Sequence, residues 1–217
     1  YRTDLAGGDT TASVNGLAIG VTAAGDVAKD RIAYRSGAKP NDLICLSGDL
    51  GAAYMGLHLL EREKRACGGQ PDPKPKFEGH EYILGRQLKP EARTDIIERL
   101  AEAGIVPTSM IDITDGLASE TLHLCKSSGC GARIYLDRLP IARQTHDMAE
   151  ELHADPVVAA LNGGQDYELL FTVPLSKQQE IFALGVDVIG HVTAAGTGAI
   201  PVTPDGSEIA LKAPGWK

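Results

Sequence analysis

Four short motifs in this sequence place aspartate beside glycine, and these residue types suit the binding of a metal and a phosphate. Aspartate offers hard oxygen ligands to Mg²⁺, while glycine lets the backbone approach a ligand and offer N–H donors. One such motif alone is more often an ordinary turn, but its repetition needs a cause. The motifs are LAGGDTTAS (5–13), LSGDLGAA (46–53), MIDITDGLASE (110–120) and NGGQDYELL (162–170).

The motif at 110–120 carries two aspartates at the junction of an expected strand and an expected helix. Strand alternation points Asp112 and Thr114 to the face opposite the isoleucines, and Asp115 follows where the chain leaves the sheet. Two interpretations are open at this point. Either Asp115 caps the helix and Asp112 lies on a solvated face, or the two carboxylates together bind a metal.

Composition and charge exclude several classes of protein. The 217 residues are 43% hydrophobic and carry a formal charge of −8, without runs of lysine or arginine, which argues against nucleic acid or an anionic membrane as a partner. No Walker A loop, GxGxxG fingerprint, HExxH or CxxC occurs, and no apolar stretch reaches the length of a membrane span. We therefore expect a cytoplasmic protein with reduced cysteines and no membrane contact.

The apolar pattern predicts an α+β fold with a mixed sheet and helices packed on one face. A break at glycine and proline near residue 38 divides the chain into 1–38 and 39–217. We expect strands over 16–27, 42–47, 110–114, 131–139, 167–174 and 186–193, helices over 51–65, 91–103, 117–128, 142–160 and 176–185, and a hairpin over 199–211.

Five motifs, taken in order, resemble those of the thiamine-monophosphate kinases, which share the aminoimidazole ribonucleotide synthetase fold. They are LAGGDTT, YRSGAKPND, SGDLGAA, IDITDGL and GGQDYELLFTVP, and they extend over nearly the whole chain. The resemblance implies Mg²⁺-dependent transfer of phosphate from ATP, the co-substrate, to thiamine monophosphate, giving thiamine diphosphate. It also implies a homodimer in the full-length protein. The first 38 residues would be the end of an amino-terminal nucleotide-binding and dimerisation domain, and the rest the carboxy-terminal domain.

The resemblance assigns roles to individual residues, but none of them acts as a covalent or acid–base catalyst. Direct attack by the substrate phosphate on ATP requires alignment and charge neutralisation rather than a nucleophilic side chain. The implied ATP contacts are Gly8, Arg35 and Thr114, the Mg²⁺ ligands are Asp9, Asp112 and Asp115, and the substrate contacts are Asp166 and Trp216.

The sequence departs from the family pattern at Gln165, where the family usually has glutamate, and at its two ends. We expect the chain to be a fragment that lacks an amino-terminal segment with further metal ligands. Two alternatives stay open. The chain could come from a sister synthetase of the same superfamily, since a fold does not fix a substrate, or it could be a non-catalytic nucleotide-binding fragment.

Overall fold

The computed structural model describes residues 3–14, 16–68, 74–209 and 211, and the chain divides into two units, Tyr1–Arg31 and Ile32–Lys217. In the first unit the described residues form no helix or strand, and Leu17, Ile19 and Val21 are 79–90% exposed. The strand predicted over 16–27 is therefore wrong in this structure. Alternation of apolar residues makes a strand only where a partner strand supplies hydrogen bonds.

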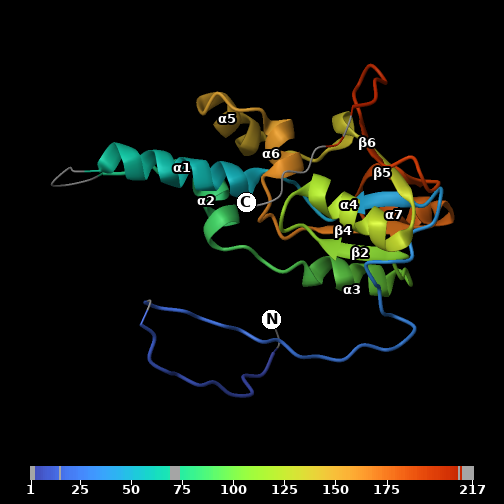
Figure 1. Ribbon diagram of the computed structural model, residues 1–217, viewed down its shortest axis with the longest axis horizontal. Helices are drawn as coiled ribbons and strands as arrows, with labels where there is room; N and C mark the ends of the chain where they lie inside the picture. The colour runs from blue at the N-terminus through green and yellow to red at the C-terminus, as the bar shows by residue number, and fades with distance from the viewer. Residues whose placement is uncertain (1–2, 15, 69–73, 210, 212–217) are drawn as a thin grey trace. The chain divides into compact units, whose positions relative to one another are not determined.

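The second unit contains the regular structure (Figure 1). Its sheet is mixed, because β3 and β6 run parallel and every other neighbouring pair is antiparallel, in the order β2-β4-β1-β5-β3-β6. The strands are β1 (Leu43–Leu46), β2 (Ser109–Asp112), β3 (Gly131–Tyr135), β4 (Leu169–Val173), β5 (Asp187–Thr193) and β6 (Ala199–Val202). The helices are α1 (Ala52–Cys67), α2 (Glu81–Leu88), α3 (Thr94–Glu102), α4 (Leu117–Ser128), α5 (Arg143–Glu151), α6 (Pro156–Asn162) and α7 (Gln178–Ala183).

Apolar side chains cover both faces of the sheet, since neighbouring strand residues point to opposite sides. In β1, Ile44 and Leu46 join a core with α4 and α6, whereas Leu43 and Cys45 join a second core with α3 and α7. The α+β class and the mixed sheet are thus confirmed. Helices pack on both faces of the sheet, α4 and α6 on one and α3 and α7 on the other, where the sequence analysis expected them on one face.

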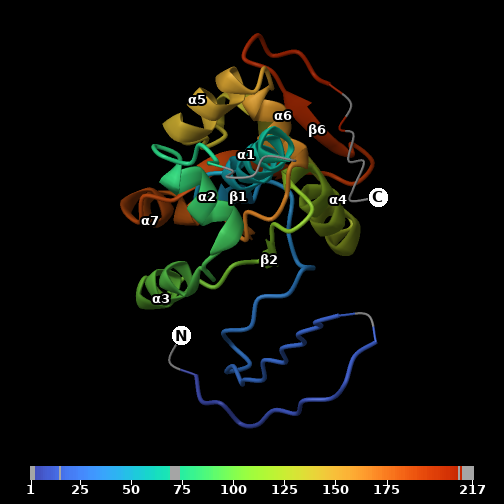
Figure 2. The ribbon, with the colours of Figure 1, turned by 90° about the vertical axis from the view of Figure 1, so that its left-hand side faces the viewer.

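A third apolar cluster joins α1, α2, α5 and α6 (Figure 2). The close approach of α1 to α2 depends on Gly56, because a Cβ there would lie 2.5 Å from the carbonyl oxygen of Ile83. The sequence did not predict α2, whose buried residue is Ile83 alone. This helix matters for the site, because it carries Arg86 to the edge of the sheet.

Most other elements lie where the sequence places them. The helix predicted over 142–160 is two helices, since Asp155 caps a new one at Pro156 by accepting from the N–H of Val157 at 2.8 Å. The hairpin beyond β6 turns at Gly206 and closes with a bridge between Val202 and Glu208. None of the described helices is both long and apolar enough to cross a membrane. The domain boundary predicted near residue 38 stays a prediction.

Candidate active site

Three of the four aspartate-glycine motifs meet at one edge of the sheet. Strands β1 and β2 end there, and β4, which is antiparallel to both, begins there. Asp112 is paired with Leu169, and the N–H of Ser47 donates to the carbonyl oxygen of Leu169 at 3.1 Å. The segments 46–53, 110–120 and 162–170 are therefore neighbours in space, as a shared site requires.

Backbone hydrogen bonds fix the turn after β2 against the segment before β4. The N–H of Gln165 donates to Thr114 at 2.8 Å, and the N–H of Tyr167 donates to Ile113 at 3.0 Å. Ile113 in turn donates to the carbonyl oxygen of Glu168 at 2.8 Å. The two motifs therefore form one rigid piece of backbone rather than two independent loops.

Asp166 lies between two residues in the left-handed region, Gln165 with φ 63° and Tyr167 with φ 53°. This backbone conformation costs roughly 1–3 kcal/mol of folding free energy for each residue other than glycine, and it persists where the surrounding structure holds it. The Asp166 carboxylate is buried and accepts from the N–H groups of Gly51 at 2.9 Å and Ala53 at 3.3 Å, at the start of α1. Burial raises its pKa to about 6, and the backbone hydrogen bonds oppose that rise. Its contact with a substrate stays a prediction.

Glu168 is the centre of a buried ion-pair network. Its Oε1 accepts from Arg86 Nη1 at 2.9 Å, and its Oε2 accepts from Arg93 and from the hydroxyl of Ser47. Arg93 also donates to the carbonyl oxygen of Ser47 at 2.7 Å. The network ties α2 and the start of α3 to the ends of β1 and β4. Sequence reasoning missed it, because the partners of Glu168 are 75 to 121 residues away from it in the chain.

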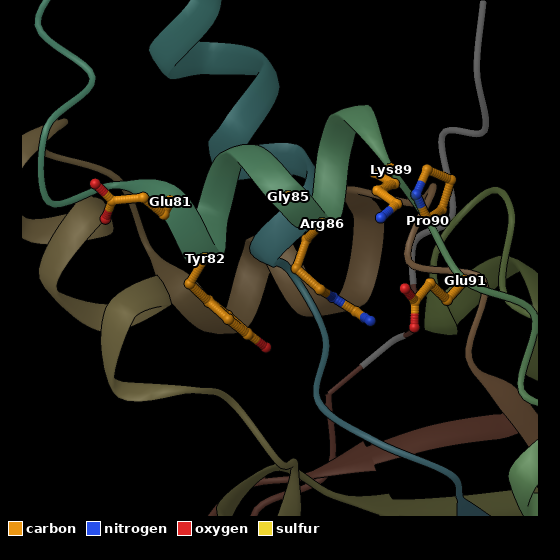
Figure 3. A pocket seen from close by; sticks show the side chains of 7 residues that line it. All are labelled: Glu81, Tyr82, Gly85, Arg86, Lys89, Pro90 and Glu91. Atoms are coloured by element: carbon orange, nitrogen blue, oxygen red, sulfur yellow. The ribbon is translucent and has the colours of Figure 1, made fainter.

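A pocket of about 290 Å³ opens beside this network (Figure 3). Arg86 Nη2 donates to the carbonyl oxygen of Asp49 at 3.0 Å, and the Tyr82 hydroxyl lies 2.6 and 2.7 Å from the two carboxylate oxygens of Asp49. Burial, and then the hydrogen bond to Asp49, raises the pKa of Tyr82, so its hydroxyl stays a donor. The pocket is lined by Glu81, Tyr82, Gly85, Arg86, Lys89, Pro90 and Glu91.

The structure tests whether Asp115 caps helix α4. Helix α4 begins after Gly116, whose φ is 107°, and no side chain caps its N-terminus. A Cβ on Gly116 would lie 2.6 Å from the carbonyl oxygen of Leu161, so glycine is required there. Asp112 is exposed and Asp115 is half-buried. Among the described residues the Asp115 carboxylate caps no helix, while the exposure of Asp112 fits the solvated-face interpretation, so binding of a metal by the two carboxylates stays a prediction.

Glu120 is a second buried carboxylate that the sequence analysis missed. It is 2% exposed, and its Oε1 lies 3.3 Å from the N–H nitrogen of Asp115 and 3.4 Å from the hydroxyl of Thr114. Burial raises its pKa, and the charge of Asp115 raises it further. Helical spacing could have indicated Glu120, because it follows Leu117 by three residues and precedes Leu124 by four, on the buried face of α4.

The other predicted site residues belong to different parts of the chain. Gly8 and Asp9 belong to the first unit, where both are exposed. Arg35 is exposed beside the outer edge of β2, since Tyr34 accepts from the N–H of Met110 at 2.8 Å. Trp216 lies outside the described residues. Within those residues no group of three or more His, Cys, Asp or Glu side chains is arranged to hold a metal.

Comparison with known proteins finds a family and several relatives that match this chain. Residues 39–202 match the family described as AIR synthase related protein, C-terminal domain. The thiamine-monophosphate kinase of Escherichia coli (strain K12) is 37% identical over 203 residues, which are 89% of this chain and 57% of that protein. That of Bacillus subtilis (strain 168) is 31% identical over 222 residues, which are 100% of this chain and 64% of that protein.

A solved structure described as "AaThiL complexed with AMPPCP and TMP" has a TM-score of 0.68 and 32% identity. The match covers 86% of this chain and 54% of that one. This chain therefore spans only somewhat more than half the length of the curated relatives and of the solved structure that it matches.

Proposed function

Since this chain belongs to the AIR synthase related family, and contains its C-terminal domain, we propose that it is part of a thiamine-monophosphate kinase. The reaction is the transfer of the terminal phosphoryl group of ATP to the phosphate of thiamine monophosphate, which yields thiamine diphosphate and ADP. The observation that carries the proposal is the Asp115 carboxylate, which caps no helix and which follows Asp112 at the edge where three motifs meet. The similarity to kinases of that name supplies the substrate.

The residues at the end of β2 fit a magnesium ion. Asp112 and Asp115 offer carboxylate oxygens that no helix cap uses, and Thr114 offers a hydroxyl. Mg²⁺ usually takes one or two protein carboxylates and leaves its other positions to water and phosphate, so a larger cluster is not required. When bound, the ion neutralises charge on the phosphate oxygens. We assign Asp9 to the same task in the first unit.

The pocket beside α2 offers two cationic side chains to the phosphate chain, although two acidic residues, Glu81 and Glu91, line it as well. Arg86 and Lys89 line it, and Asp49 at its border belongs to the glycine-containing motif after β1. Arg86 is held by Glu168 at 2.9 Å, so its guanidinium is already oriented before a phosphate arrives. We assign the further ATP contacts to Gly8, Arg35 and Thr114.

Phosphoryl transfer requires little covalent chemistry from the protein. An oxygen of the substrate phosphate forms the new P–O bond as the bond between the terminal phosphorus and the ADP oxygen breaks, and ADP leaves with the electron pair. The side chains orient the two phosphate groups and offset their charge. Asp166 and Trp216 are assigned to the thiamine substrate. We also assign the intact protein to a homodimer in the cytoplasm.

The test is a transfer assay with the intact protein, ATP, Mg²⁺ and thiamine monophosphate, followed by chromatography of thiamine diphosphate. We expect product equimolar with ADP. Separate reactions offer the phosphate acceptors of the sister synthetases at the same concentration. Turnover of one of those, with none of thiamine monophosphate, would assign the chain to a sister enzyme. ATP binding without any turnover would leave only a nucleotide-binding role.

A further inference from the structure

Glu120 is a buried ionisable residue whose surroundings do not account for its charge. It lies in the first turn of α4, on the face that carries Leu117 and Leu124 into the core, and it is 2% exposed. Burying a carboxylate among apolar groups is costly unless a cation or several hydrogen bonds offset its charge. A glutamate at this position therefore calls for a specific partner.

One oxygen of Glu120 holds the turn that precedes α4. Its Oε1 accepts from the N–H of Asp115 at 3.3 Å and from the hydroxyl of Thr114 at 3.4 Å. Both residues belong to the proposed site, so displacement of this oxygen would remove two of the hydrogen bonds that hold the turn. A neutral amide oxygen could accept the same two hydrogen bonds. The contact therefore explains an acceptor at residue 120, but it does not explain a charge.

The hydrogen bonds to the turn leave the other oxygen of Glu120 unexplained. Glu120 Oε2 is buried and has no hydrogen-bond partner among the residues that the structure describes. The turn that Glu120 Oε1 holds carries a second carboxylate, that of Asp115. Two adjacent carboxylates, one of them buried, are stabilised when a cation binds between them or beside them.

We propose that Glu120 is a positioning residue, which orients the Thr114–Asp115 turn through Oε1 and adds its negative charge to the binding of a divalent cation by Asp115. This inference rests on the proposed function for the reaction, but its effect on cation binding can be measured without turnover. Partners of metal ligands act in this way in other metal sites, where their loss weakens metal affinity 10- to 100-fold.

The experiment compares Glu120→Gln and Glu120→Ala with the wild-type protein in its intact form. Binding of Mn²⁺ alone is followed by electron paramagnetic resonance, and turnover and thermal unfolding without metal are measured in parallel. We expect Glu120→Gln to weaken Mn²⁺ binding about 10-fold or more while its unfolding midpoint stays or rises. Glu120→Ala also loses the acceptor for Asp115, so its turnover should fall below that of Glu120→Gln. The matched control is Glu98→Gln, at an exposed position on α3.

The outcomes separate the two proposals. Wild-type Mn²⁺ affinity in Glu120→Gln would overturn the role of the charge, and equal turnover in Glu120→Gln and Glu120→Ala would overturn the role of Oε1. If the wild-type protein makes no thiamine diphosphate, the proposed function fails, while the Mn²⁺ measurement still decides whether Glu120 acts on the cation. Should Glu120→Ala not fold, Glu120→Gln and its control still test the charge.

Discussion

Replacement of Asp166 by Asn tests how this edge of the sheet is held. The Asp166 carboxylate is 2% exposed and accepts from the N–H groups of Gly51 and Ala53. Burial raises its pKa from 3.8 to about 6. If the carboxylate is buried in solution as it is in the structure, the titration of Asp166 must contribute to the pH dependence of the free energy of unfolding.

The sign and size of the effect follow from linkage between proton binding and folding. Between pH 3.8 and about 6 the native state holds the Asp166 proton more tightly than the unfolded state does, so the free energy of unfolding falls as pH rises. A pKa raised to about 6 corresponds to a loss of about 3 kcal/mol, complete near pH 7. Asp166→Asn removes this loss, but it gives up one hydrogen bond, worth about 1 kcal/mol. We expect the variant to match wild type near pH 4.5 and to exceed it by about 2 kcal/mol at pH 7.5.

Urea unfolding, followed by circular dichroism at several values between pH 4.5 and 7.5, measures this difference directly. Asp147→Asn, at an exposed position on α5, serves as the matched control and should run parallel to wild type. Curves for Asp166→Asn that also run parallel to wild type would refute the reasoning. A raised KM for thiamine monophosphate in Asp166→Asn, with the KM for ATP unchanged, would support the predicted substrate contact.

Three further substitutions test the site. Asp115→Asn should cut turnover at least 100-fold without lowering the unfolding free energy in the absence of metal, because no helix cap is lost. Its control is Asp155→Ala, which removes the cap of α6. This control should lower the unfolding free energy by about 1 kcal/mol and leave turnover intact. Gly116→Ala should lower the unfolding free energy by about 2–4 kcal/mol in urea titrations. Gly129→Ala, where a Cβ meets nothing within 4 Å, should lower it by about 1 kcal/mol. Equal losses in the two variants would refute the close contact at Gly116. Arg86→Lys keeps the charge but loses donors, so it should lower stability by about 1–3 kcal/mol and raise the KM for ATP; an unchanged KM would remove Arg86 from the phosphate site.

The sequence was sufficient to predict the elements that begin or end at an aspartate-glycine motif. Strands β1, β2 and β4 and helices α1 and α4 combine an apolar pattern with such a boundary, and both features are local. Helix α2 was missed, because it has one buried residue and depends on packing against α1. The segment 16–27 has the pattern of a strand, but none of its residues pairs with another strand in the structure, and alternation alone does not form one.

Site residues divide in the same way. The motif predicts that Asp112 ends a strand and that Asp115 lies in the turn before a helix, and the structure agrees. The burial of Asp166 could not be predicted, since the N–H groups that it binds are more than 110 residues away in the chain. Whether Asp115 caps a helix was also undecided, because the answer depends on the backbone angle of Gly116.

The acidic groups at this edge are of two kinds, and the distinction locates the expected cation. Glu168 is balanced by two arginines, and Asp166 is held by N–H groups at the start of a helix. At the end of β2, by contrast, Asp115 lies beside Glu120, and within the described part of the chain neither forms a salt bridge. Two arginines balance Glu168 near β4, whereas in the described part of the chain no cationic side chain pairs with Asp115 or Glu120 at the end of β2. A cation that binds at this edge should therefore do so at the end of β2, where it stabilises both the site and the turn that forms it.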